Sequence, residues 1–271
     1  MARDRPDAGL PRDPSQHEEP MARPPSKTRP GRPKAAAPRR PAVLTGPMVP
    51  VLGWPPDEDR VEAIFARLAG VMPDPKTELN YTNPFTFVVA VALSAQATDV
   101  GVNKATETLF RVADTPAKML ALGEEGLIPF ISSIGLYRNK ARNVIALSRI
   151  VLERHGGEIP LTREALQALP GVGRKTASVV LNEMGVEPAI AVDTHVFRVS
   201  HRLGLANAAT PDKVEAQLHG VVPEAWLPKA HHWLILHGRY VCTARKPKCS
   251  ACVISDLCPS RAGLQTLGEA V

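Results

Sequence analysis

The sequence predicts an all-α protein. From about residue 57 onward, apolar residues recur at helical spacing in short segments. Glycine and proline separate these segments, as they do at helix ends. The hairpin dipeptides that would join alternating strands are missing, and no strand pair can be identified.

Residues 1–56 are expected to form a disordered, basic, Pro-rich tail. Residues 1–50 hold 12 of the 27 prolines, and ten Lys and Arg against five Asp and Glu. Such a segment cannot bury enough apolar surface to offset the entropy of ordering it. Because the tail carries most of the net charge of +6, the rest is nearly neutral. Any face of the folded part that binds a polyanion must therefore be a local patch.

The helices are assigned in chain order. Asp59 is expected to cap a helix that runs to Leu68 and ends at Gly70 and Pro73. Residues 85–95 are a nearly continuous apolar run, which is read as a buried helix although its β-branched content would permit a strand. The remaining helical segments are residues 99–111, 116–122, 139–155, 162–168, 173–184, 193–203, 211–221 and 224–237.

The sequence shows no sign of membrane insertion or export. No apolar run approaches the roughly 18 residues that a membrane helix requires. The charged, Pro-rich start does not resemble a signal peptide. We therefore expect an intracellular protein of bacterial type, cytoplasmic and associated with the nucleoid.

A glycine-rich turn, Leu169-Pro170-Gly171-Val172-Gly173, lies between two of the predicted helices. Pro170 stops the first helix, and the glycines permit backbone angles that other residues avoid. The next helix would present free N–H groups to an anion, with Arg174 and Lys175 adding charge. The pattern indicates a phosphate-binding helix-hairpin-helix, although such a turn could also be a plain connector.

All four cysteines lie within 17 residues, with the spacing C-x6-C-x2-C-x5-C. In an intracellular chain this favours a metal centre over disulfides. Both tetrahedral zinc and an iron–sulfur cubane accept four thiolates, and His237 leaves a mixed zinc site open. The predicted ligands are Cys242, Cys249, Cys252 and Cys258.

A basic loop lies between the first two cysteines. Arg245, Lys246 and Lys248 lie in six residues whose ends a bound metal would hold in place. A rigid cationic loop can contact phosphates with little loss of entropy. The alternative is an ordinary solvated run of charge.

The motifs together resemble the endonuclease III family of helix-hairpin-helix DNA glycosylases with associated lyase activity. The resemblance covers residues 59–258 and raises the metal prediction to one [4Fe–4S] cluster. Its motifs are Leu93 to Asp99 (LSAQATD), Leu169 to Asn182 (LPGVGRKTASVVLN), Ala191 to Val199 (AVDTHVFRV), His231 to Tyr240 (HHWLILHGRY) and the cysteine spacing.

The resemblance implies two all-α lobes with DNA across the cleft between them. A six-helix barrel lobe would comprise residues 77–187, with the helix-hairpin-helix at about 163–184. Residues 57–76 and 188–271 would form the iron–sulfur cluster lobe. We expect a monomer that binds double-stranded DNA containing damaged pyrimidines or abasic sites.

The same resemblance assigns the site residues. Lys175 matches the catalytic lysine and Asp193 the catalytic aspartate. Gln96 would fill the space left by a flipped base, and Leu136 would act as a wedge beside the orphaned partner. The remaining predicted DNA contacts lie in the glycine-rich turn and the basic loop: Gly171, Val172, Gly173, Arg174, Arg245, Lys246 and Lys248.

Each assignment has a plainer alternative. By side-chain type alone, Lys175 could be a phosphate contact, and Asp193 could cap the helix that follows it. Gln96 could be a helix-end polar residue, and Leu136 a core leucine. We expect His195, His231 and His232 to be buried structural residues.

The predicted activity is removal of oxidised pyrimidines followed by β-elimination through a lysine Schiff base. A lysine attacks only when neutral, a form that burial and a helix N-terminus both favour. Two other readings stay open. One is an adenine-mismatch glycosylase of the same superfamily, which normally lacks a lysine at this position. The other is a non-catalytic damage-binding protein.

Overall fold

The computed structural model describes residues 53–263, so the predicted tail falls almost wholly outside the described residues. Within this range every regular element is helical, as predicted. The α-helices are α1 (Glu58–Val71), α2 (Pro84–Ser94), α3 (Asp99–Val112), α4 (Pro116–Ile131), α5 (Tyr137–His155), α6 (Arg163–Gln167), α7 (Arg174–Glu183), α8 (Thr194–Arg202), α9 (Pro211–Val221) and α10 (Leu227–Tyr240). The short 3-10 turns are η1 (Glu224–Trp226) and η2 (Cys249–Ala251).

Short polar side chains begin most of the helices. Asp57, not Asp59, caps α1 by accepting a hydrogen bond from the Arg60 N–H, and the helix runs to Val71 before Pro73. Thr162 lies just outside α6, where its hydroxyl accepts from the Ala165 N–H. Side-chain oxygens at these positions satisfy N–H groups that have no partner within the helix.

Helix α4 is longer than predicted. The expected end near Leu122 coincides with Gly123, whose φ of +66° breaks the regular path, but the chain resumes helical geometry and continues to Ile131. Glycine adopts this left-handed conformation without a side-chain clash. The sequence signal therefore marks a kink and not the end of the helix.

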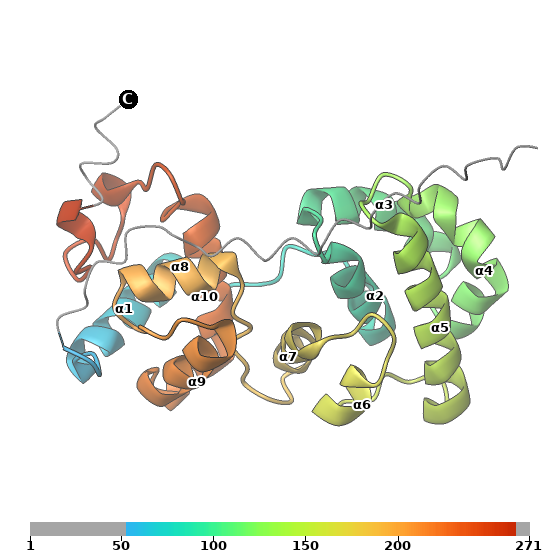
Figure 1. The fold of residues 1–271 in the computed structure, drawn as a ribbon, viewed down its shortest axis with the longest axis horizontal. Helices are drawn as coiled ribbons and strands as arrows, with labels where there is room; N and C mark the ends of the chain where they lie inside the picture. Colours follow the sequence, from blue (N-terminus) through green and yellow to red (C-terminus); the bar gives the residue numbers. More distant parts are fainter. Residues whose placement is uncertain (1–52, 264–271) are drawn as a thin grey trace, which may run out of the picture. The chain divides into compact units, whose positions relative to one another are not determined.

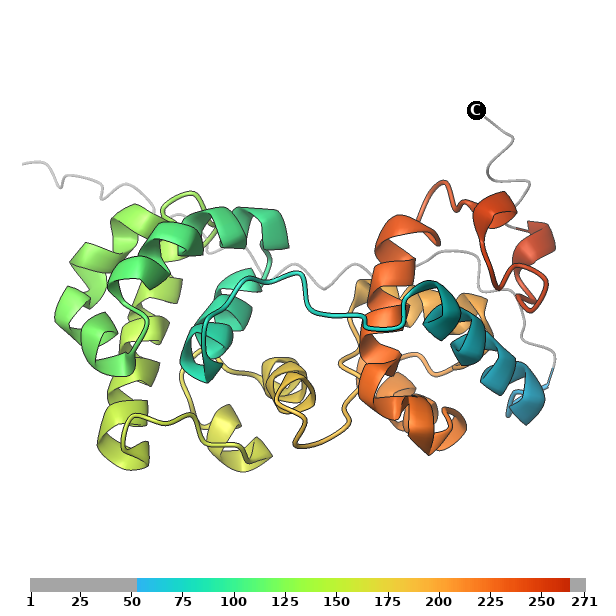
Figure 2. The same cartoon turned by 180° about the vertical axis from the view of Figure 1, so that it is seen from behind.

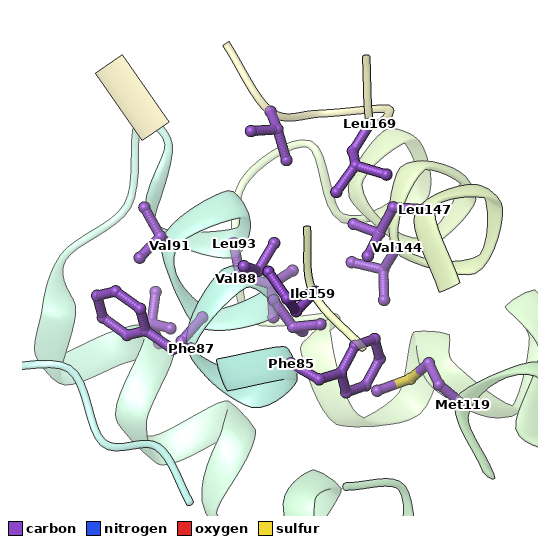
Figure 3. Packing of buried hydrophobic residues seen from close by; sticks show 14 of the residues in the cluster. Phe85, Phe87, Val88, Val91, Leu93, Met119, Val144, Leu147, Ile159 and Leu169 are labelled. Atoms are coloured by element: carbon purple, nitrogen blue, oxygen red, sulfur yellow. The ribbon is translucent and has the colours of Figure 1, made fainter. Parts of the chain in front are cut away.

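Helices α2 to α7 surround the first of two hydrophobic cores. Helix α2 is buried on all its faces from Phe85 to Leu93, which explains its unbroken apolar run. Figure 3 shows Phe85, Met119 and Val144, from three different helices, pointing into this interior. Despite its composition, neither α2 nor any other helix in the described part of the chain is long and apolar enough to cross a membrane.

The second core joins the first helix to the C-terminal part of the chain. Helix α1 packs against α10, far along the sequence (Figures 1 and 2). The Trp233 Nε1–H donates to the Met72 carbonyl at 2.9 Å, and Arg60 donates to the Leu203 carbonyl at 2.8 Å. The fold thus has two all-α lobes, each with its own core.

Candidate active site and metal centre

The turn between α6 and α7 is held by buried apolar side chains, and its two glycines, Gly171 and Gly173, are exposed. Leu169 and Val172 are buried in the first core. Gly171 has a φ of +81°, and a Cβ atom there would lie 3.1 Å from the Asn143 Cβ. Both the backbone angle and the close approach of α5 therefore require glycine at this position.

The N-terminus of α7 presents its N–H groups without a side-chain cap, because its N-cap residue is Gly173. Lys175 and Arg174 both lie on the exposed surface of the first turn. Arg174 is already engaged: its guanidinium lies 3.1 Å from Glu215 and 3.9 Å from Asp212. A phosphate would have to compete with these carboxylates for Arg174.

Lys175 and Asp193 come together although 18 positions separate them in the sequence. The Lys175 Nζ lies 4.0 Å from the Asp193 Oδ2, with side chains 55% and 12% exposed. The other carboxylate oxygen, Oδ1, accepts hydrogen bonds of 2.8 Å from the N–H groups of His195 and Val196. Asp193 therefore caps α8 with one oxygen and faces the lysine with the other.

Helix α10 carries two buried histidines, His231 and His232, as expected. Burial, together with repulsion from His232, lowers the pKa of His231 to about 3, so His231 is neutral at pH 7. His232 lies 3.3 Å from Glu183 at the far end of α7, and the same carboxylate accepts from the Tyr81 hydroxyl at 2.9 Å. His195, by contrast, is only partly buried.

Gln96 and Leu136 share an unusual backbone conformation. Their φ values are +57° and +60°, and no other non-glycine residue among positions 53–263 has a positive φ. Such strain persists where the surrounding structure imposes it, often at functional positions. Leu136 is 61% exposed, so it is not the core leucine of the plainer reading.

The four cysteines line one cavity at the end of the second core. About 330 Å³ of space free of protein atoms, including open solvent, lies among them, Leu203, His237 and Pro247. Burial and repulsion from the neighbouring thiols raise the pKa values of Cys249, Cys252 and Cys258, that of Cys258 to about 11. Thiols so placed require a positively charged centre to become thiolates.

The arrangement of the four cysteines around one cavity fits an iron–sulfur cluster. Within residues 53–263 no set of three or more His, Cys, Asp or Glu side chains converges closely enough to hold one metal ion. Four cysteines around a shared space are the ligand set of a cubane, whose irons each take one thiolate. Arg202 donates to the Cys242 Sγ at 3.4 Å, and His237 Nε2 lies 3.6 Å from the Cys252 Sγ. When bound, the cluster supplies metal–thiolate bonds that hold this part of the chain together.

The basic loop is fixed at its backbone and free at its side chains. Arg202 donates to the carbonyls of Thr243 and Ala244 at 2.7 and 2.9 Å. The three cationic side chains are exposed, and none forms an ion pair with another described residue. These side chains are Arg245, Lys246 and Lys248.

This fold and site define a class of protein. Residues 89–224 match the family model described as HhH-GPD superfamily base excision DNA repair protein. Residues 242–258 match the iron-sulfur binding domain of endonuclease III. The protein is a helix-hairpin-helix base excision DNA repair enzyme with an iron–sulfur centre, and the cofactor prediction is confirmed.

Several proteins similar to this chain are endonuclease III enzymes, which narrows this class to one family. Endonuclease III of Escherichia coli strain K12 is 57% identical over 195 residues, 72% of this chain and 92% of that protein. Endonuclease III of Haemophilus influenzae is 56% identical over 199 residues, 73% of this chain and 94% of that protein. A non-covalent endonuclease III–DNA complex aligns with a TM-score of 0.73 and 42% identity, covering 78% and 99% of the two chains.

A trapped endonuclease III–DNA covalent intermediate aligns with a TM-score of 0.70 and 42% identity, covering 77% of this chain and 98% of that one. The chain belongs to the endonuclease III family. It is a DNA N-glycosylase with DNA-(apurinic or apyrimidinic site) lyase activity, and it binds DNA. Membership of this family therefore favours the glycosylase and lyase activity over an adenine-mismatch glycosylase and over a non-catalytic damage-binding protein.

Sequence reasoning missed two features of the site. The contact of Glu183 with Tyr81 and His232 joins three distant segments, and no spacing pattern announces it. Lys140 is buried at 7% exposure although it lies in a polar stretch. Its position four residues before buried Val144 was a usable signal, because it places Lys140 on the apolar stripe of α5.

Proposed function

We propose that this enzyme removes oxidised pyrimidines from duplex DNA and then cleaves the strand by β-elimination, with Lys175 as nucleophile and Asp193 as its acidic partner. The observation that carries the proposal is the convergence of the two side chains at 4.0 Å. They lie beside a helix N-terminus whose free N–H groups suit a DNA phosphate.

Lys175 must lose its proton before it can attack. The Asp193 Oδ2 lies 4.0 Å from the Lys175 Nζ, so this carboxylate is placed to receive that proton. The side chain is half exposed in the free protein, so it is poorly desolvated there. Bound DNA would cover the amine and exclude bulk water from it.

Asp193 acts mainly through its charge. Its Oδ1 is held by two backbone N–H groups, which fixes the direction of the free Oδ2. A carboxylate so oriented stabilises positive charge that develops on the deoxyribose as the base departs. It can also receive the proton that the attacking amine releases.

The covalent steps use only Lys175 and the DNA, and water then hydrolyses the final imine to free the lysine and release the product. The Lys175 nitrogen bonds to C1′, the C1′–N bond to the base breaks, and the base leaves with the electron pair and a proton. The nitrogen lone pair then expels the ring oxygen, which takes a proton, to give a Schiff base. This imine acidifies C2′, and loss of a C2′ proton breaks the C3′–O bond to the 3′ phosphate.

Gln96 and Leu136 are proposed to hold the duplex open. Unstacking and unpairing a base costs a few kcal/mol, which an inserted side chain can partly offset. Both residues are exposed on strained turns, as a rigid wedge would be. The turn at Gly171, Val172 and Gly173 and the exposed loop cations are proposed to bind phosphates.

The finer features of the interaction are also proposals. We infer that the substrates are duplexes carrying damaged pyrimidines or abasic sites, and that the enzyme acts as a monomer on nucleoid DNA. We also propose lobe boundaries at about residues 76 and 187, which the membership of the two hydrophobic cores supports. The trapped covalent intermediate of a relative supports covalent chemistry at Lys175.

Borohydride trapping tests the nucleophile. Reduction in the presence of a thymine glycol duplex should join wild-type protein to DNA, because the imine becomes a stable amine. Lys175→Ala should form no adduct, whereas Lys213→Ala, a matched change at an exposed lysine of α9, should form it normally. An adduct with Lys175→Ala would overturn the assignment. Product mapping on oligonucleotides with single defined lesions tests the pyrimidine preference.

A further inference from the structure

Lys140 is a buried lysine for which the proposed mechanism has no use. It lies in the first turn of α5 and is 7% exposed. Burial lowers its pKa, and among residues 53–263 no carboxylate forms an ion pair with it. A buried ammonium without a counter-ion is costly, so a compensating contact is required.

The compensating contact is the C-terminus of α2. The Lys140 Nζ donates a 2.9 Å hydrogen bond to the carbonyl of Leu93, the second-last residue of that helix. The carbonyls of a last turn have no partners within the helix, and the helix dipole places negative charge there. Lys140 therefore acts as a side-chain cap across 47 positions of sequence.

The two strained turns lie at the two ends of this contact. Gln96 follows Leu93 by three positions in the turn after α2. Leu136 precedes Lys140 by four, and the Lys140 N–H donates to the Leu136 carbonyl at 3.1 Å. Lys140 thus bonds through its backbone to Leu136. Through its side chain it bonds to the end of α2, from which the turn of Gln96 continues.

We propose that Lys140 is a positioning residue that couples the turns of Gln96 and Leu136, so that both side chains enter the duplex as one unit. This inference rests on the wedge roles proposed above. The buried bond limits the relative movement of the turns, and a fixed spacing is what two side chains need to occupy one gap in a base stack. Without the bond, each side chain would act separately.

A double-mutant cycle tests the coupling. Single-turnover base excision from a thymine glycol duplex is measured for Gln96→Ala, Leu136→Ala and the double variant. In the wild-type background the two single effects should not multiply. We expect the excision rate of the double variant to exceed, by about threefold or more, the rate obtained by multiplying the two single effects. In Lys140→Met, which keeps the side-chain length without the donor, the two effects should multiply.

The control is Ser148→Ala on the same helix. Ser148 is fully buried, and its hydroxyl donates to the Val144 carbonyl at 2.7 Å, so the change removes a buried hydrogen bond within α5 and leaves the bond from Lys140 to α2 in place. The coupling should persist in this background. Fluorescence of 2-aminopurine opposite an abasic analogue gives a second readout, and Lys140→Met should lower the signal rise on binding.

The outcomes separate the two proposals. Single variants without effect would overturn the wedge roles and this inference with them. Single effects that multiply in wild type, or a coupling that Lys140→Met leaves unchanged, would overturn the role of Lys140 alone. If Lys140→Met melts below the assay temperature, both cycles are run at a lower temperature at which the variant is folded, and the same outcomes decide.

Discussion

Two lysines differ in the helix end that their amines meet: Lys175 lies at the N-terminus of its own helix, whereas the Lys140 amine contacts the C-terminus of another helix. The contrast shows how position gives identical side chains different roles. Lys175 lies at the N-terminus of α7, and its side chain is 55% exposed. Lys140 is buried against the C-terminus of α2, where the dipole favours an ammonium. The first position suits a nucleophile that must become neutral, and the second suits a cation that holds the scaffold.

Replacing each lysine with methionine should have opposite consequences for activity and stability: Lys175→Met should abolish most activity, and Lys140→Met should lower stability. The loss of activity is the largest expected effect. Lys175→Met should slow single-turnover base excision on the order of 10³-fold or more, because the covalent route is lost. It should change the free energy of unfolding by less than about 0.5 kcal/mol, since its contacts are on the surface.

Lys140→Met should cost about 1–3 kcal/mol of the free energy of unfolding, because the Leu93 carbonyl loses its buried donor. It should still form the borohydride adduct. Urea denaturation and adduct formation measure the two quantities. If both variants lost stability equally, the contrast between a reactive and a structural lysine would not hold.

Asp193→Asn should separate the charge of Asp193 from its capping role. Excision should fall on the order of 10²–10³-fold, because an amide cannot stabilise positive charge on the sugar. Asparagine caps a helix about as well as aspartate, so the free energy of unfolding should change little. Asp193→Ala should lose the same activity and about 1 kcal/mol of stability as well. Retained activity in Asp193→Asn would contradict the electrostatic role.

His231 extends the comparison to a buried group that stays neutral. Because its folded pKa of about 3 lies below the unfolded value near 6.5, only the unfolded chain takes up this proton as the pH falls. The stability due to His231 is full above about pH 6.5 and declines toward pH 3, by roughly 1 kcal/mol per pH unit.

Urea denaturation at several pH values between about 5 and 7.5 measures this decline. His231→Gln should flatten it, whereas His219→Gln, at an exposed position of α9, should not. An unchanged slope in His231→Gln would show that other groups cause the pH dependence.

The loop cations should have the smallest effect, because their side chains are exposed and pair with no carboxylate among residues 53–263. Replacing Arg245, Lys246 and Lys248 with alanine should weaken DNA binding without changing lesion preference. The slope of log affinity against log salt should fall by roughly 0.9 for each phosphate that the altered loop no longer neutralises. Fluorescence anisotropy at several salt concentrations measures this slope. An unchanged slope would indicate that the loop is only a solvated surface.

Local signals predicted most of the helices and the chemistry-bearing motifs. Proline and glycine spacing located the turn before α7, and α9 begins and ends where its pattern predicts. The cysteine spacing identified a metal centre but left zinc and iron–sulfur open, because both accept four thiolates. The family model over residues 242–258 decided between them.

The amino-acid sequence was enough to identify the residues of the site, but their contacts with one another depend on how the helices pack. Periodicity and turn chemistry act over a few positions, so they predicted α7 and a capping role for Asp193. They could not show that one Asp193 oxygen caps α8 while the other faces Lys175, or that Lys140 reaches α2. These contacts join residues 18 and 47 positions apart, and such distances close only when the helices pack around a shared core.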